Sequence, residues 1–312
     1  MAESHQQYCC ICGEPASIPP KMIGGRVYCD RHYALVNKPH PGFWRAGVLQ
    51  LLGMGLFCLI VAMIGQILPP LEPTAAVIVG VVLAVVPTAL WLWYFYRQDQ
   101  LEPEPKTKLG LVFIVALALT DFFGRRLIYD WLNVASWAAA NTWTSLLASV
   151  FIRGFVWQII MYVAIRVIVY DTDEFDERMD GIVYGTVAGL GVATLLNLHY
   201  VLDNGGVALA PGVVHIVTTA LAQASFGGLL GWFMAEAKFT HRPVWFVPLG
   251  YAVSSMLNGL FSWLISEVSA IGLTVDPWRS LAVGLAVALA AYFVLIALMR
   301  RSTDVTLSRT TP

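Results

Sequence analysis

The sequence predicts an all-α polytopic membrane protein of about eight transmembrane helices, with a small zinc-ribbon-like knuckle at its N-terminus. Of the 312 residues, 58% are hydrophobic and only 12% are charged. The apolar residues form long runs rather than amphipathic stripes, which is typical of membrane spans. A set of paired Cys and His residues precedes the first run. We therefore expect a cytosolic knuckle and linker over 1–45, a membrane domain over 46–300 and a cytosolic tail over 301–312.

The N-terminal segment has the ligand spacing of a closed metal site. Cys9 and Cys12 form one C-x-x-C pair, and a C-x-x-H pair, Cys29 and His32, follows after a loop. Two short-spaced pairs of this kind are typical of a structural Cys3His zinc site, which leaves no coordination position open for catalysis. The alternatives are a chance cluster and cysteines that form disulfides. Cys10 is predicted to be a bystander, and reduced zinc-binding thiols favour a cytosolic location.

Eight apolar runs have the length of a membrane-crossing helix. They cover residues 46–68, 74–96, 108–124, 151–170, 181–202, 211–236, 243–268 and 279–299. Lys and Arg are concentrated in the loops after the second, fourth and sixth runs and in the tail, so the positive-inside rule places both termini in the cytoplasm. The Trp-rich segment 127–150 is either a helix in the outer interface or an extension of the fourth span.

Polar side chains fall at similar depths on four predicted spans. At a rise of 1.5 Å per residue, Gln158 lies about 10 Å, Asn197 about 7 Å, His215 about 6 Å and Asn258 about 15 Å below the outer end of its helix. Such residues are costly in lipid, so we expect a shared polar pocket; the alternative is that each bonds a backbone carbonyl or a neighbouring helix. His199 lies one helical step away, as a pocket member or an interfacial residue. No carboxylate falls in this layer to activate water, which favours a binding cavity over a hydrolase.

Several unusual motifs follow one another along the membrane domain. They are YRQDQLEPEP at 96–105, EFDE at 174–177 followed by DGIVYG at 180–185, the polar helix end at 193–200, and PGVVH at 211–215. In this order and spacing they resemble the PrsW family of glutamic intramembrane proteases, within the wider CAAX-protease-like superfamily. The resemblance covers roughly Tyr94 to Phe261. It implies a protein of the bacterial plasma membrane whose substrates or clients are membrane proteins or transmembrane segments.

The departures from the family pattern fall on its chemistry. The family's E-E-x-x-K signature, in which a Glu is taken to activate water, aligns with the segment WQIIM at 157–161. In the family's E-N-x-x-Y element, Leu196 replaces the Glu while Asn197 and Tyr200 remain. The last element, H-G-x-x-D or H-G-x-x-N, reads NGLFS at 258–262. Both glutamates of the signature are therefore absent.

The candidate catalytic positions are His215 and Asn197 as retained residues, Gln158 and Asn258 as degenerate positions, and His199 as an addition. Losing a general base costs roughly two to four decades in rate, which favours an inactive homologue that binds membrane-embedded or membrane-anchored proteins as a regulator or adaptor. An active PrsW-type protease with altered groups around the two histidines is the first alternative. A transporter-like or lipid-binding protein is the second, although no inverted repeats support it. A net charge of −1 without a basic patch predicts no nucleic-acid partner.

Overall fold

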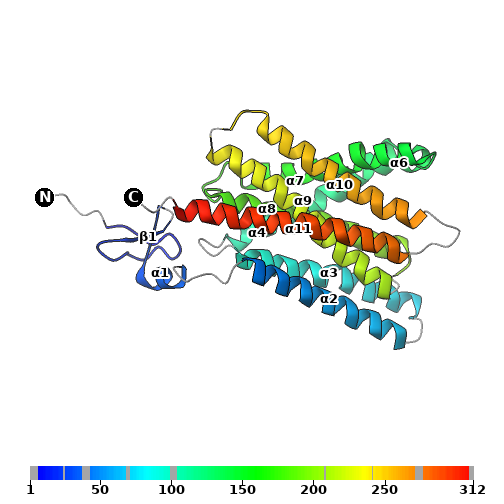
Figure 1. Ribbon diagram of the computed structural model, residues 1–312, viewed down its shortest axis with the longest axis horizontal. Helices are drawn as coiled ribbons and strands as arrows, with labels where there is room; N and C mark the ends of the chain where they lie inside the picture. The colour runs from blue at the N-terminus through cyan, green and yellow to red at the C-terminus, as the bar shows by residue number, and fades with distance from the viewer. Residues whose placement is uncertain are drawn as a thin grey trace.

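A small N-terminal domain lies at one end of a long helical bundle in the computed structural model of the chain (Figure 1). The described residues are 6–23, 25–36, 43–67, 71–98, 104–206, 209–240, 242–270 and 277–308. The predicted linker into the membrane and residues 99–103 of the YRQDQLEPEP motif lie outside them. We call the end of the bundle that carries the N-terminal domain the near end, and the opposite end the far end.

The N-terminal domain is a hairpin followed by one short helix. Strand β1 (Lys21–Ile23) pairs antiparallel with β2 (Arg26–Tyr28), and α1 (Asp30–Val36) follows. Gly25 has a φ of +84°, a left-handed conformation that glycine adopts without strain in a tight turn. The buried core consists of Ile23, Tyr28 and Val36. Domains below about 40 residues usually need a disulfide, a metal or a partner surface, so a core this small must be supported from outside.

Long helices build the membrane domain, and they alternate in direction along the bundle (Figure 1). They are α2 (Phe43–Ile67), α3 (Pro73–Gln98), α4 (Lys106–Leu119), the π-helix η1 (Thr120–Trp131), α5 (Val134–Ala138), α6 (Thr142–Ala148), the π-helix η2 (Ser149–Gly154), α7 (Phe155–Ile168), α8 (Arg178–Asp203), α9 (Leu209–Phe239), α10 (Phe246–Ala270) and α11 (Pro277–Ser308).

Within the described residues, 6 helical segments are long and apolar enough to cross a membrane. They are Arg45–Ile67, Pro73–Arg97, Thr142–Ile168, Arg178–Asp203, Pro211–Phe239 and Ala282–Val305. The predicted spans at 108–124 and 243–268 also fall on helices of the bundle, α4 with η1 and α10, which are outside this set. The predicted fourth span begins at Thr142 rather than 151, because α6 and η2 continue into α7. Residues 142–150 therefore extend that span.

Helices α8 and α9 form the centre of the bundle, and glycines set their separation. A Cβ added at Gly231 would lie 1.7 Å from the carbonyl oxygen of Gly181, and one at Gly185 would lie 2.3 Å from that of Gly227. No side chain fits such a distance, so these glycines are what allows the two helices to approach so closely. The central position follows from burial, because 89% of the α8 apolar window is buried against 11% for α2.

Candidate functional site

The four predicted metal ligands of the N-terminal domain come together. Their ligand atoms all lie within 4.8 Å of one another. The Cys12 and Cys29 sulfurs are 3.8 Å apart, and the Nδ1 atom of His32 lies 3.5 Å from the Cys9 sulfur and 3.2 Å from that of Cys29. A tetrahedral site with metal–sulfur bonds of about 2.3 Å has sulfur–sulfur edges of about 3.8 Å. These residues can therefore hold a metal ion, and the cysteines are free thiols rather than disulfides.

Local backbone geometry places these ligands. The N–H of Gly13 donates to the carbonyl of Cys9 at 2.9 Å, which closes the first C-x-x-C turn, and Gly13 has a φ of +67°. The N–H of Cys10 donates to the carbonyl of Val27 at 2.9 Å, which ties this turn to β2. The side chain of Cys10 packs against the small core instead of joining the ligands. Helix α1 starts directly after Cys29 and presents His32 in its first turn.

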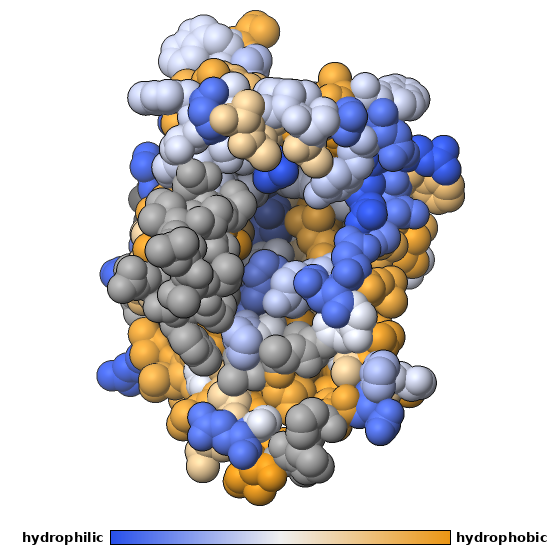
Figure 2. Space-filling view, turned by 90° about the vertical axis from the view of Figure 1, so that its right-hand side faces the viewer, coloured by the Kyte–Doolittle hydropathy of each residue, from blue (hydrophilic) through white to orange (hydrophobic). Residues whose placement is uncertain are grey.

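A cavity of about 330 Å³ lies at the far end of the bundle. Figure 2 looks onto this end and shows a hollow with hydrophilic side chains inside it and along its rim. The walls come from η1, η2, α7, α8, α9 and α10. The lining residues are Arg125, Tyr129, Arg153, Trp157, Leu196, His199, Tyr200, Asp203, Asn204, His215, Thr219, Gln223, Phe261, Ser262 and Ile265.

Both predicted histidines line this far-end cavity. The ring of His215 stacks on Tyr200, with centroids 4.1 Å apart. Nε2 of His199 lies 3.3 Å from a carboxylate oxygen of Asp121. The sequence placed no carboxylate beside these histidines, because Asp121 is 78 residues away from His199 and lies near the end of the predicted third span. His199 therefore has an acidic partner that the sequence did not predict.

The three predicted amide residues are buried away from the cavity lining. Asn197 donates to the backbone carbonyl of Ile216 at 3.1 Å. Asn258 and Gln223 exchange two hydrogen bonds, of 3.0 and 2.9 Å. Gln158 is fully buried, and neither polar atom of its side chain has a hydrogen-bond partner in the described structure. Its helix begins earlier than predicted, so the depth that the sequence assigned to Gln158 does not hold.

Three positions that the resemblance aligns with the family signature nevertheless meet in the cavity, although Gln158, Asn197 and Asn258 do not line it. Trp157 stands at the first Glu of E-E-x-x-K, Leu196 at the Glu of E-N-x-x-Y, and Ser262 at the final Asp or Asn of the last element. All three line the same cavity as His215. These three positions thus lie close together. They carry an aromatic, an aliphatic and a hydroxyl side chain, where the resemblance implies acids or an amide.

Arginine and amide residues of the lining were missed by sequence reasoning. Arg125 lies 3.8 Å from Asp203. Arg153 lies close to the outer end of the predicted fourth span, 151–170, and its depth in the membrane domain became apparent only because the span begins at Thr142. Its Nε is buried without a hydrogen-bond partner in the described part of the chain. Gln223 gives no signal in the sequence, because its role depends on which helix faces it.

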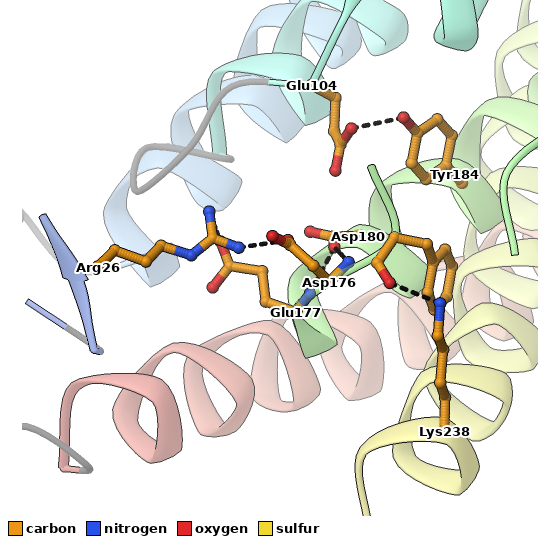
Figure 3. A network of polar contacts seen from close by, with 8 residues as sticks. Arg26, Glu104, Asp176, Glu177, Asp180, Tyr184 and Lys238 are labelled. Carbon is orange, nitrogen blue, oxygen red and sulfur yellow. Dashed lines mark hydrogen bonds and ion pairs between the residues drawn. The ribbon is translucent and has the colours of Figure 1, made fainter. Parts of the chain in front are cut away.

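A second polar cluster lies at the near end, where the N-terminal domain meets the bundle (Figure 3). Arg26 of β2 is ion-paired with Asp176, and its Nη1 lies 3.9 Å from an oxygen of Glu177. One oxygen of Asp180 accepts hydrogen bonds from the backbone N–H groups of Asp176 and Glu177, at 2.8 and 2.6 Å. Lys238 donates to the backbone carbonyl of Phe175 at 2.7 Å. The EFDE motif and Asp180 therefore fix the loop that leads into α8.

A buried carboxylate extends this near-end cluster. The hydroxyl of Tyr184 donates to Glu104, and burial raises the pKa of Glu104 to about 7. Burial also raises the pKa of Glu177, although the nearby Arg26 guanidinium opposes this. These acids lie at the opposite end of the bundle from His215, so they supply no carboxylate to the far-end cavity.

The long apolar helices define an integral, multi-pass membrane protein. A family model described as "PrsW family intramembrane metalloprotease" matches residues 104–299. The chain therefore belongs to the PrsW family.

Curated relatives agree with this family. The chain is 32% identical over 133 residues to "Protease PrsW" of Geobacillus kaustophilus, which covers 42% of this chain and 54% of the relative. It is 29% identical over 119 residues to "Protease PrsW" of Bacillus subtilis, covering 37% and 53% respectively. The chain thus spans about half the length of the curated relatives it matches. No solved structure matches.

The word metalloprotease raises the question of a catalytic metal in the far-end cavity. Catalytic zinc sites use three protein ligands and leave one position open. Among the described residues, the N-terminal Cys and His set is the one place where three or more such ligand atoms lie within reach of one metal ion. His199, His215 and Asp203 do not form such a set. The cavity residues therefore do not fit a catalytic metal.

Proposed function

We propose that this protein binds membrane-embedded or membrane-anchored proteins in its far-end cavity without cleaving them, as a regulator or adaptor. The observation that carries the proposal is the convergence of Trp157, Leu196 and Ser262 on one cavity beside His215. Neither Trp nor Leu can take a proton from water, and removal of a general base costs about two to four decades in rate. The cavity, in contrast, keeps the polar groups that binding needs.

Reconstitution separates binding from cleavage. The full-length protein in proteoliposomes is incubated with a panel of single-span membrane proteins. We expect some of them to be retained by the tagged protein, and none to be cleaved above the level of protein-free liposomes. Cleavage that is lost in His215→Ala but kept in Arg126→Gln, an exposed residue outside the cavity lining, would contradict the proposal.

An active protease with altered groups is the second candidate, and one contact favours it. The 3.3 Å separation of His199 and Asp121 places a carboxylate where it can orient the imidazole as a base. Under this alternative, His199→Ala and Asp121→Asn would each abolish cleavage. Under the preferred function, both variants leave the absence of cleavage unchanged and alter only client retention.

For the N-terminal domain, we propose a structural zinc ion held by Cys9, Cys12, Cys29 and His32. Three thiol ligands and one imidazole suit zinc, and four protein ligands leave no open position. We also propose that both termini lie on the cytoplasmic side of a bacterial plasma membrane. Support comes from the C-terminal part of α11, which ends at the same end of the bundle as the N-terminal domain (Figure 1).

Metal analysis tests the zinc assignment. Purified wild-type protein should contain about one equivalent of zinc, and the double variant Cys29→Ser/His32→Ala should contain none. Cys10→Ser is the matched control, since Cys10 lies beside the ligands without joining them. Equal metal content in the wild type and the double variant would refute the site.

A further inference from the structure

Arg153 carries a charge deep inside the membrane domain. It lies on η2, within the continuous span Thr142–Ile168. At 1.5 Å per residue, Arg153 is about 16 Å from the Thr142 end of that span. Charged side chains at such depth are costly, and they face a polar cavity or a counter-charge. Arg153 faces the far-end cavity.

The acids around the far-end cavity are already engaged by other residues. Asp203 is the carboxylate among the lining residues, and it lies 3.8 Å from Arg125. Asp121 lies 3.3 Å from His199. Arg153 has no ion pair within the described part of the chain, and its Nε is buried without a hydrogen-bond partner. The cavity therefore holds one more positive charge than its own acids balance.

We infer that the far-end cavity contains an anion-binding subsite centred on Arg153, and that it takes the free C-terminal carboxylate of a peptide. An arginine guanidinium binds a carboxylate through two parallel N–H···O bonds. The hydroxyl groups of Thr219 and Ser262 line the same cavity and are further donors for the second carboxylate oxygen. This inference rests on the proposed client-binding function and specifies which part of a client the cavity recognises.

Size and position of the cavity favour a peptide end over a phospholipid. A volume of about 330 Å³ is at the lower limit of ligand pockets, which range over roughly 300–1,000 Å³. The hollow opens at the far end of the bundle in Figure 2, so the end of a chain segment can enter it directly. Trp157, Tyr200 and Phe261 supply apolar and aromatic surface for the residues that precede the carboxylate.

A matched peptide pair tests the subsite. The full-length protein in nanodiscs of zwitterionic lipid is titrated into a dye-labelled apolar hexapeptide with a free C-terminal carboxylate, and into the same peptide as a C-terminal amide. Fluorescence anisotropy gives both Kd values. A charge-assisted contact predicts that wild type binds the carboxylate form at least ~10-fold more tightly. Arg153→Gln should remove this preference, Arg153→Lys should retain part of it, and Arg126→Gln should retain it in full.

Each other outcome contradicts a specific step. Equal affinity of wild type for both peptides would overturn the anion subsite while leaving client binding intact, provided that full-length clients are still captured. A preference that survives Arg153→Gln would overturn the assignment to Arg153. Capture of full-length clients without binding of either peptide would also overturn the subsite. Failure to capture any client or peptide would overturn both the subsite and the proposed function.

Discussion

The two ends of the bundle differ in whether their arginines have carboxylate partners. At the near end, several arginines have carboxylate partners, such as Arg178 with Glu236 at 2.8 Å and Arg26 with Asp176. At the far end, Arg153 has no carboxylate partner among the described residues, and the ion pair of Arg125 with Asp203 is long and exposed. Matched charges fix a structure, whereas an unmatched charge in a cavity leaves room for a ligand. We therefore assign a structural role to the near end and place the proposed binding of clients at the far end.

The largest loss of stability should come from breaking the buried near-end ion pair of Arg178 and Glu236. Glu236 accepts from Arg178 and also from Arg242, at 3.0 Å, and Arg178 and Glu236 are both buried. Glu236→Gln leaves the charge of Arg178 buried without a counter-charge, which should lower the free energy of unfolding by about 3–5 kcal/mol. Denaturant titration of the protein in mixed micelles measures this.

The far-end pair supplies the matched control for this measurement. Asp203→Asn breaks the 3.8 Å contact with Arg125, in which the Asp203 side chain is 65% exposed. Exposed pairs contribute about 0–1 kcal/mol, so the unfolding free energy should change little. Similar losses from Glu236→Gln and Asp203→Asn would remove the distinction between the two ends.

A smaller effect is expected from pH at the near end. Burial raises the pKa of Glu104 to about 7, against an ordinary value of 4.5, so the folded protein binds this proton more tightly than the unfolded chain does. Stability from Glu104 is therefore fully present below pH 4.5 and falls as the pH rises through 7, by up to about 3 kcal/mol at 1.4 kcal/mol per pH unit. The facing groups are Tyr184 and Asp180, whose hydrogen bonds oppose the rise in pKa, and two further acids, Asp176 and Glu174, whose charges add to it.

Thermal unfolding between pH 5 and 8 measures this dependence. Glu104→Gln removes the titrating group and should flatten the stability profile over this range. Asp173→Asn, an exposed acid of the same near-end loop, should keep the wild-type slope. A wild-type slope that persists in Glu104→Gln would show that another group carries it.

The smallest of the three effects concerns the contact between the two parts of the protein. Arg26→Gln removes the cation that faces the buried Glu177, but Asp176 is 52% exposed and screened by solvent. We expect a loss of about 1–2 kcal/mol and faster limited proteolysis of the N-terminal domain, with unchanged metal content. Lys21→Gln, which breaks a fully exposed pair with Asp30, should leave the proteolysis rate unchanged. Equal rates in all three proteins would argue against docking through Arg26.

Features that depend on local sequence were predicted, and those that depend on helix orientation were not. Apolar runs predicted the bundle, and ligand spacing predicted the cluster of Cys9, Cys12, Cys29 and His32, because both are set by residues close together in the chain. The contact of His199 with Asp121 joins two helices whose rotation is set by packing. For the same reason, the sequence grouped Asn197 and Asn258 with His215 by depth alone, although these two side chains bond Ile216 and Gln223 of α9 and lie outside the cavity lining. The depth of Arg153 was missed because the predicted span began at 151, which placed this residue at the interface, whereas the helical segment begins at Thr142.

The glycine contacts group the walls of the far-end cavity into two halves, each built from two closely packed helical elements. Helix α8 is locked to α9 at Gly181 and Gly231, and a second lock joins η2 to α10, where a Cβ at Gly154 would lie 2.1 Å from the carbonyl oxygen of Ser255. Leu196, Tyr200 and His215 belong to the first half, whereas Arg153, Phe261 and Ser262 belong to the second. A change in cavity width is therefore a movement of one half against the other. The side-chain amides of Gln223 and Asn258 exchange two hydrogen bonds across the halves. A movement that widens the cavity would have to break these two hydrogen bonds.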